Sequence, residues 1–293
     1  MEDGFVRSVG LGSNLFRPLS LVVDKRGMYY DPQTASDLEH LLQQGQWSVA
    51  QRAIATRYQQ NFVQQGLSKY NLGGETFKLD VKAGQAQQRP LILIPGQVED
   101  DASVHYGSPY VRTNAELIQR VRQQHPQAYI LYKPHPDVVA GNRVGQVDTR
   151  YLQQYVDQVV VDADIVACLR AVDQVHTMSS LTGFEALLHG KAVHCYGGPF
   201  YAGWGLTTDY MDLPRRQRQL SLAELIYATV FAYPYYVMPP RVGLNGLAAP
   251  ESVMHYVANY AKKTSTRADR FLTRLARTQP KAAALLQMLF SRY

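Results

Sequence analysis

The fold of this chain is decided by the stretch Leu91-Ile92-Leu93-Ile94-Pro95-Gly96-Gln97 and by four apolar runs that follow it before Gly205. Short, continuous apolar runs of this kind are typical of strands that are covered on both faces of a parallel sheet. Helical patterns fill most of the gaps between the runs, and this alternation predicts an α/β fold with a doubly wound parallel sheet. The predicted strands are Leu91–Pro95, Ala128–Lys133, Val159–Asp162, Val175–Met178 and Val193–Tyr196.

Polar, small or charged residues follow four of the five predicted strands. Ligands of an open parallel sheet bind outside the carboxyl ends of its strands, so we expect these segments to surround one crevice. They are Gly96–Asp101, Pro134–Pro136, Ser179–Gly183 and Gly197–Pro199.

Helix signals lie on both sides of this region. Ser36-Asp37-Leu38-Glu39 is a capping-box pattern in which Ser36 and Glu39 would satisfy each other's free amides, and it opens a helix that stops at Gly45. A second helix is predicted from Ser48 to Gln65, and a third from Ser221 to about Ala232, where Pro234 ends it. Between the strands, helices are predicted over Thr113–Gln124, Asp148–Tyr155, Ile165–Ala171 and Thr182–His189.

Composition sets the broad class of protein. The 293 residues are 46% hydrophobic and 18% charged, which excludes a disordered chain. The net charge of +6 favours anionic ligands or surfaces. No zinc-finger, RNP or helix-turn-helix pattern points to nucleic acid. The two cysteines, Cys168 and Cys195, have neither a metal-binding nor a disulfide spacing, and we expect them to be buried thiols of a cytoplasmic protein.

His135 stands between two prolines in Lys133-Pro134-His135-Pro136, directly after a predicted strand. The prolines restrict the backbone and fix the direction of the imidazole. We interpret His135, with Lys133 beside it, as a contact for a phosphate or leaving group, although a lone histidine is more often structural.

Ser179, Ser180, Thr182 and Glu185 lie at a strand-to-helix junction. Free amides and the helix dipole make such a junction an anion site, and Glu185 would accept hydrogen bonds from a ribose diol. The alternative is an ordinary serine cap with a glutamate in the first turn.

Three carboxylates, Glu99, Asp100 and Asp101, follow the first predicted strand. At the rim of a crevice that faces a phosphate site they are candidates for a nucleophile or general base, whereas the alternative is a solvated turn. The glycine-rich segment Gly197–Thr207 would let the backbone approach a ligand closely, and we expect Tyr201 and Trp204 to offer ring faces to a sugar or base. The alternative there is a structural turn.

A basic helix is predicted near the C-terminus. It is either a solvated face or a contact with anionic lipid. Its cations are Arg267, Arg270, Arg274, Arg277 and Lys281.

Several of these motifs closely resemble the KpsC family of capsule polysaccharide export proteins, and the chain looks like one of its β-Kdo transferase modules. The resemblance runs in order through about residues 1–240. The motifs that carry it are Glu2–Gly12, Pro18–Asp24, Gly27–Asp31, Gln97-x-x-x-Asp101, Lys133–Pro136, Ser179–Glu185 and Gly197–Thr207.

The resemblance implies a GT-B fold and a retaining glycosyltransferase. The implied donor substrate is CMP-Kdo, with no metal and no other cofactor, and the implied acceptor is a lysophosphatidylglycerol-linked Kdo chain. The enzyme would work in the cytoplasm at the periphery of the inner membrane, in contact with capsule assembly proteins. The implied domains are an acceptor-side Rossmann-like remainder (1–85), a donor-binding Rossmann-like domain (86–240) and a helical tail (241–293).

The resemblance also implies roles for particular residues. Asp101 would attack the anomeric carbon, His135 would meet the CMP phosphate, and Glu2 or Asp3 would act as a base or sugar contact. The implied donor-binding residues are Gln97, Lys133, His135, Ser179, Ser180, Thr182, Glu185 and Gly203.

In this family the first domain starts before the Glu-Asp-Gly motif, so the resemblance implies that part of that domain is lacking here. Two alternatives stay open. One is another CMP-ulosonate transferase of the sialyl type, and the other is a non-catalytic capsule-assembly partner.

Overall fold

The computed structural model describes residues 1–6, 18–68, 89–238 and 247–263, and its helices and strands form two compact units. Among these residues, the larger unit comprises 24–66 and 89–233, and the smaller comprises 1–6, 18–23, 67–68, 234–238 and 247–263. The domain boundary at residue 85 that the resemblance implies and the predicted basic helix from Arg267 to Lys281 lie outside the described residues.

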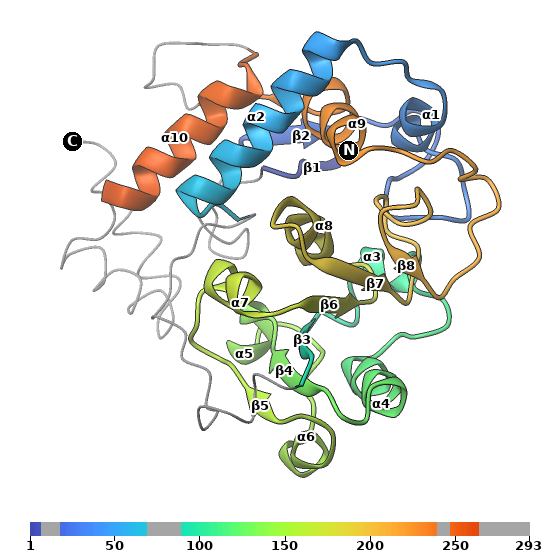
Figure 1. The fold of residues 1–293 in the computed structure, drawn as a ribbon, viewed down its shortest axis with the longest axis vertical. Helices are drawn as coiled ribbons and strands as arrows, with labels where there is room; N and C mark the ends of the chain where they lie inside the picture. Colours follow the sequence, from blue (N-terminus) through green and yellow to red (C-terminus); the bar gives the residue numbers. More distant parts are fainter. Residues whose placement is uncertain (7–17, 69–88, 239–246, 264–293) are drawn as a thin grey trace. The chain divides into compact units, whose positions relative to one another are not determined.

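A six-stranded parallel sheet forms the centre of the larger unit in the part of the chain that the structure describes (Figure 1). Its spatial order is β5-β4-β3-β6-β7-β8, so the chain moves outward from β3 in one direction and then returns to continue in the other. This order is the doubly wound Rossmann arrangement, which confirms the predicted fold class. The strands are β3 (Leu91–Pro95), β4 (Tyr129–Lys133), β5 (Gln158–Val159), β6 (Gln174–Thr177), β7 (Ala192–Cys195) and β8 (Thr208–Asp209).

Helices cover both faces of this sheet (Figure 1), as a parallel sheet requires. On one face, α4 packs its Leu117, Ile118 and Val121 against Ile92 and Ile130, and α6 lies beside it. On the other face, α7 and α8 pack against the sheet. The helices between β3 and β7 are α3 (Ala102–His105), α4 (Asn114–Gln124), α5 (Pro136–Val139), α6 (Thr149–Tyr155), α7 (Ile165–Ala171) and α8 (Leu181–Leu188).

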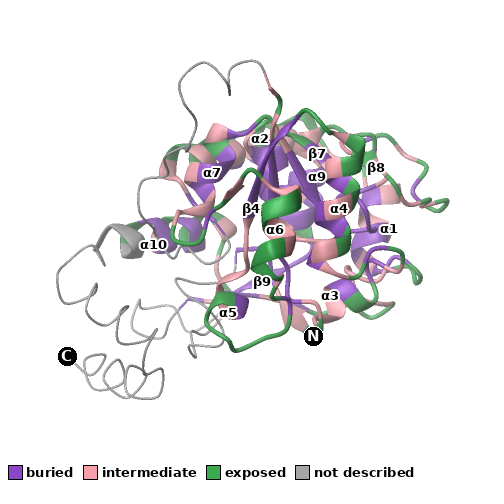
Figure 2. Ribbon diagram, turned by 90° about the horizontal axis from the view of Figure 1, so that it is seen from below, coloured by how far each residue is buried: buried purple, intermediate pink, exposed green. Residues whose placement is uncertain are grey.

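The burial of the strands agrees with the prediction that the sheet is covered on both faces. The sheet strands are buried at the centre, and α6 presents an exposed outer surface (Figure 2). Cys168 and Cys195 are both free and buried, as expected, and burial raises the pKa of the Cys168 thiol to about 11.

The N-terminal helices belong to the sheet unit, whereas the sequence suggests a boundary near residue 85. Helix α2 packs on α8 and α9, and Gln59 Nε2 donates a hydrogen bond to the Leu188 carbonyl at 2.9 Å. These apolar and polar contacts hold the segment 24–66 to the sheet unit. The elements are α1 (Asp37–Gln44), α2 (Val49–Gln65), α9 (Leu222–Ile226) and the π-helix η2 (Tyr227–Ala232), which continues α9.

The smaller unit contains a three-stranded antiparallel sheet in order β1-β2-β9, together with α10. Tyr236 of β9 pairs with Ser20 of β2, so the chain leaves the sheet unit at Pro234 to return to its own N-terminal segment. Sequence analysis did not anticipate this return. The elements are β1 (Glu2–Asp3), β2 (Ser20–Val22), β9 (Tyr235–Tyr236) and α10 (Pro250–Lys263).

Most predicted elements of the sheet region are confirmed within a few residues. The third predicted strand, Val159–Asp162, is displaced toward the N-terminus in the structure, because β5 pairs with β4 only at Gln158 and Val159. The two-residue strand β8 was missed, since Thr208 and Asp209 carry no apolar run.

Three histidines gather on the α4 face of the sheet. The rings of His176 and His194 stack with centroids 4.1 Å apart, and His125 at the end of α4 lies edge-on at 4.9 Å from His176. Burial, together with the charges of the two neighbouring imidazoles, lowers the pKa of His176 to about 2.

This cluster predicts a loss of stability on mild acidification. The unfolded chain binds a proton at His176 below its ordinary pKa of about 6.5, whereas the folded chain does not until about pH 2. Stability is therefore fully present above pH 6.5 and falls as the pH decreases. We expect His176 to contribute a slope of about 1.4 kcal/mol per pH unit between pH 6 and pH 4.5. Urea unfolding at several pH values measures this slope.

A His176→Asn variant should show a flatter pH dependence in the same range, whatever its absolute stability. An unchanged slope in the variant would contradict a dominant role of His176.

Candidate active site

The strands β3 and β6 lie side by side at the point where the strand order reverses, and their carboxyl ends carry predicted site residues. Gln97 follows β3 and Ser179 follows β6, and Gln97 Nε2 donates a hydrogen bond to Ser179 Oγ at 3.1 Å. Ligands of doubly wound sheets bind at this reversal. The structure thus brings together residues that are 82 positions apart in the sequence.

Asp101 caps the short helix α3. Its Oδ1 accepts hydrogen bonds from the Ser103 amide at 2.9 Å and from Ser103 Oγ at 2.6 Å. The Ser103 carbonyl in turn accepts a hydrogen bond from Ser179 Oγ at 2.8 Å. Asp101 is therefore held in place beside the loop that follows β6.

The other two carboxylates of this loop have different surroundings. Glu99 Oε1 accepts a hydrogen bond from the Asn114 amide at 2.7 Å, while Asp100 is exposed and pairs with Arg143 at 3.0 Å. Glu99 thus supports the start of α4 and Asp100 faces solvent. Of the three, Asp101 is the carboxylate that is connected through Ser103 to the β6 loop.

His135 follows β4, the neighbour of β3 on the other side, and caps α5. Its Nδ1 accepts a hydrogen bond from the Asp137 amide at 3.2 Å. In the neutral imidazole one ring nitrogen accepts and the other carries the proton. This contact assigns the proton to Nε2, which makes Nε2 a hydrogen-bond donor suited to a phosphate oxygen.

Lys133 is the last residue of β4, and the alternation of the strand places it on the face that α7 covers. Its Nζ donates a hydrogen bond to the Val161 carbonyl at 3.2 Å. Burial lowers the pKa of Lys133, against the opposing effect of Asp164 and Asp162. Lys133 lies two positions before His135 in the sequence, but its Nζ is bound to the segment after β5.

Helix α8 begins at the site with Ser180 as its cap. Ser180 Oγ accepts a hydrogen bond from the Thr182 amide at 3.2 Å, and the Ser180 amide donates to Thr177 Oγ1 at 3.1 Å. Glu185 lies one turn further and is only 5% exposed. The start of α8 thus combines aligned amides with hydroxyls, as anion sites do.

The two large aromatic residues of the glycine-rich segment after β7 have a structural role. The expectation that they offer ring faces to a ligand is wrong. Tyr201 and Trp204 are both 0% exposed. Tyr201 Oη donates to the Ser180 carbonyl. A Cβ added at Gly183 would lie 2.2 Å from Tyr201 Oη. Trp204 Nε1 donates to the Phe200 carbonyl at 2.8 Å. Both rings are thus enclosed in the protein interior, and Tyr201 is bound to the residue that caps α8.

Gly203 has a positive φ of 82°, a conformation that glycine adopts without strain. Its amide donates to Asp209 Oδ2 at 2.8 Å, and an added Cβ would lie 3.0 Å from Leu213 and Arg216. The turn at Gly203 therefore depends on the absence of a side chain, independently of any ligand.

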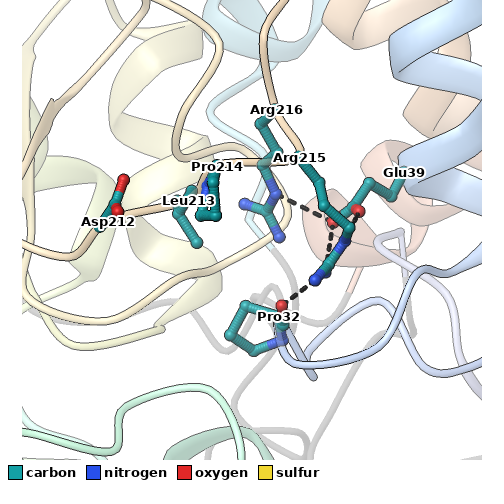
Figure 3. A pocket seen from close by; sticks show the side chains of 7 residues that line it. All are labelled: Pro32, Glu39, Asp212, Leu213, Pro214, Arg215 and Arg216. Carbon is teal, nitrogen blue, oxygen red and sulfur yellow. Dashed lines mark hydrogen bonds and ion pairs between the residues drawn. The ribbon is translucent and has the colours of Figure 1, made fainter.

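Sequence reasoning missed the buried arginine that holds this segment. Arg216 is 8% exposed, and its guanidinium donates to Glu39 Oε2 at 3.1 Å (Figure 3). It also donates to the Ala202 carbonyl at 2.8 Å. Glu39 also pairs with Arg215. Ser36 accepts a hydrogen bond from the Glu39 amide as predicted, but the Glu39 carboxylate binds the two arginines and does not return a bond to the Ser36 amide. Pro32 closes the small cavity here, of about 20 Å³, which has room for about one water.

Asn114 is a second residue that sequence reasoning missed. It is fully buried, and its side chain forms a two-way pair with the backbone of Gln97: its Oδ1 accepts from the Gln97 amide and its Nδ2 donates to the Gln97 carbonyl, both at 2.8 Å. A polar residue at the first position of a predicted helix was the available signal, but its partner could not be read from the sequence.

Glu2 and Asp3 lie on β1 of the smaller unit, where they pair with Val22 and Leu21 of β2. Both are partly buried. Their predicted role toward the sugar or acceptor stays a prediction.

No group of three or more histidine, cysteine or acidic side chains in the described ranges has the arrangement of a metal site. Within the same ranges, no helix combines the length and apolarity that crossing a membrane requires.

Comparison with solved structures defines the class of protein. The chain is similar to Thermosulfurimonas dismutans KpsC, beta Kdo 2,4 transferase (TM-score 0.77, 35% identity, 88% of this chain and 78% of that chain). It is also similar to the beta Kdo 2,7 transferase of the same KpsC (TM-score 0.72, 37% identity, 88% and 76%). The fold is thus α/β of the GT-B type.

The sequence comparisons identify the family. Residues 1–236 match the model of the Capsule polysaccharide biosynthesis protein family, and the chain belongs to this family. It is 50% identical over 239 residues to capsule polysaccharide modification protein LipA of Neisseria meningitidis serogroup B, covering 82% of this chain and 33% of LipA. It is 41% identical over 265 residues to lipopolysaccharide-processing protein LpsZ of Rhizobium meliloti, covering 89% of this chain and 58% of LpsZ. The chain therefore spans a third to just over half of these relatives.

The geometry of His135 predicts a specific loss of phosphate binding in the His135→Asn variant. Asparagine is a good helix cap, so it keeps the bond from the Asp137 amide while the Nε2 donor is lost. A hydrogen bond to a charged group contributes about 1.5–3 kcal/mol, so the predicted contact between His135 and the CMP phosphate implies that the affinity for CMP falls by about 10- to 100-fold in the variant. Titration calorimetry with CMP measures this change.

Cytidine, which lacks the phosphate, is the control ligand. Its affinity should be the same for the variant and the unsubstituted chain. Equal losses for CMP and cytidine would place His135 at the nucleoside or indicate a general distortion.

Proposed function

We propose that this chain is a β-Kdo glycosyltransferase module that transfers Kdo from CMP-Kdo with retention of anomeric configuration. Support comes from its similarity, at 35–37% identity over most of its length, to two structures named as β-Kdo transferases. Membership of the capsule polysaccharide biosynthesis family sets the context in which the product would be used.

One observation carries the proposal. Asp101, His135 and the Ser179-Ser180 turn follow the three neighbouring strands β3, β4 and β6, at the reversal of the strand order. A carboxylate, a neutral imidazole donor and the start of a helix thus share one edge of the sheet. These are the groups that transfer of a sugar from a phosphate requires.

In the proposed first step, the Asp101 carboxylate attacks the anomeric carbon of Kdo and forms a glycosyl ester. The bond between that carbon and the phosphate oxygen breaks, and CMP leaves with the electron pair. The Nε2–H of His135 and the amides at the start of α8 stabilise the departing phosphate. Charge-directed donors of this kind are effective because they are fixed before the reaction.

In the second step, an acceptor hydroxyl attacks the same carbon and displaces the Asp101 carboxylate. Two inversions give net retention, as in retaining glycoside hydrolysis. A base accepts the hydroxyl proton, and we assign this role to Glu2 or Asp3. CMP-Kdo is a substrate, and the scheme calls for no metal and no other cofactor.

The proposed acceptor is a lipid-linked Kdo chain built on lysophosphatidylglycerol. The net charge of +6 suits an anionic donor, an anionic acceptor and a peripheral position at the inner membrane. Capsule assembly proteins are the proposed macromolecular partners, and no nucleic acid is involved.

The direct test is transfer by the purified chain from CMP-Kdo to a synthetic acceptor that ends in β-Kdo, with the anomeric form of the product determined by NMR. CMP-sialic acid is supplied in parallel. Transfer from CMP-sialic acid in preference to CMP-Kdo would make the chain a sialyl-type transferase. Binding of CMP without transfer from either donor would favour a non-catalytic assembly partner.

The nucleophile assignment predicts the behaviour of Asp101→Asn. Asparagine still caps α3, so the fold should be retained, while the carboxylate needed for the glycosyl ester is removed. We expect the transfer rate to fall by about a thousandfold or more, with CMP affinity changed less than about threefold. Initial rates of Kdo transfer measure this loss.

Asp100→Asn is the matched control, because Asp100 is exposed and pairs with Arg143 on the surface. It should keep most of the activity. Near-normal transfer by Asp101→Asn would remove Asp101 from the mechanism.

A further inference from the structure

The side chain of Gln97 joins the ends of β3 and β6. It is 6% exposed, and its amide oxygen accepts hydrogen bonds from Thr177 Oγ1 at 3.1 Å and from the Ser179 amide at 3.0 Å. Its amide nitrogen donates to Ser179 Oγ at 3.1 Å. Both ends of the Gln97 amide are therefore bound to the protein.

These bonds have a fixed direction. Because Ser179 Oγ accepts from Gln97, its own proton is donated elsewhere, and it goes to the Ser103 carbonyl at 2.8 Å. Because Thr177 Oγ1 donates to Gln97, it is left as an acceptor, and it receives the Ser180 amide at 3.1 Å. The hydroxyls of Ser179 and Thr177 thus each donate one hydrogen bond and accept one.

The network reaches the proposed nucleophile through Ser103. The Ser103 carbonyl is held by Ser179, while the Ser103 amide and hydroxyl both donate to Asp101 Oδ1. The position of the Asp101 carboxylate is thus tied to the loop after β6 through two residues.

The backbone around Gln97 is fixed as firmly as its side chain. Asn114 pairs with the backbone amide and carbonyl of Gln97, and the preceding Gly96 donates to the Lys133 carbonyl at 2.7 Å. An added Cβ at Gly96 would lie 3.2 Å from the His135 amide nitrogen. Gln97 therefore stands between the segment of His135 and the segment of Ser179.

We infer that Gln97 is a positioning residue that holds the Asp101 carboxylate in register with the start of α8, acting through Ser179 and Ser103. The inference rests on the proposed function and replaces the expectation that Gln97 itself binds the donor. A misplacement of a reacting group by about 1 Å costs about a hundredfold in rate. A residue of this kind governs the rate of transfer more than the binding of the donor.

The test compares the kinetics of Gln97→Met and Ser179→Ala. Methionine matches the length of glutamine without charge, so it removes the hydrogen bonds without repelling a phosphate. We expect kcat for Kdo transfer to fall by about 10- to 100-fold with the KM for CMP-Kdo changed less than about threefold. A rise in KM at unchanged kcat would show that Gln97 contacts the donor and would overturn the inference.

The double variant tests the route of the effect. Because Ser179 acts in series with Gln97, adding Ser179→Ala to Gln97→Met should cost less than the product of the two separate losses. Fully multiplicative losses would overturn the route through Ser179. Gln154→Glu, at an exposed position of α6, is the control and should behave as the unsubstituted chain.

Hydrogen–deuterium exchange separates this inference from the proposed function, because it needs no activity. Gln97→Met should speed amide exchange in α3 and at the start of α8, with α6 unchanged. Unchanged exchange in α3 would overturn the inference even in an active enzyme. Absence of Kdo transfer by the unsubstituted chain would overturn the proposed function alone, and the exchange result would still decide the role of Gln97.

Discussion

The structure of the sheet unit depends on the parallel pairing of β3 with β6. These strands are separated along the chain by two complete strand–helix units, yet Leu93 lies opposite Val175 in register. Parallel strands end at the same edge of a sheet, so this pairing places the loop of Asp101 next to the loop of Ser179. The hydrogen bonds between the two loops are possible only because the pairing sets the distance between them.

Much of this arrangement was accessible from the sequence. Apolar runs such as Leu91–Pro95 and helical patterns such as Thr113–Gln124 act over a few residues, and they predicted elements that the structure confirms. The edge at which site residues gather followed from the doubly wound topology, because the topology decides where the carboxyl ends lie. The prediction succeeded where the determining physics is local or follows from the strand order.

The remaining features depend on contacts between distant segments. The residues that bind the side chain of Gln97 are about 80 positions away, and the arginines that bind the side chain of Glu39 are about 176 positions away. Tyr201 and Trp204 look like ligand-facing rings beside glycines, but both are completely buried, and their polar atoms bind the backbone carbonyls of Ser180 and Phe200. The assignment of α1 and α2 to the sheet unit has the same cause, because it rests on contacts with α8 and α9 that no local pattern encodes.

The ion pair between Glu39 and Arg216 has a consequence for the synthesis of the protein. The two residues are 177 positions apart, and the guanidinium also binds the carbonyls of Pro199 and Ala202. On the ribosome, which makes the chain from the N-terminus at about 5–20 residues per second, Glu39 emerges many seconds before its partner. The segment after β7 therefore acquires its central support only when Arg216 has left the exit tunnel. The closing of this pair is a late event of folding, and until then the buried rings around it lack their final packing.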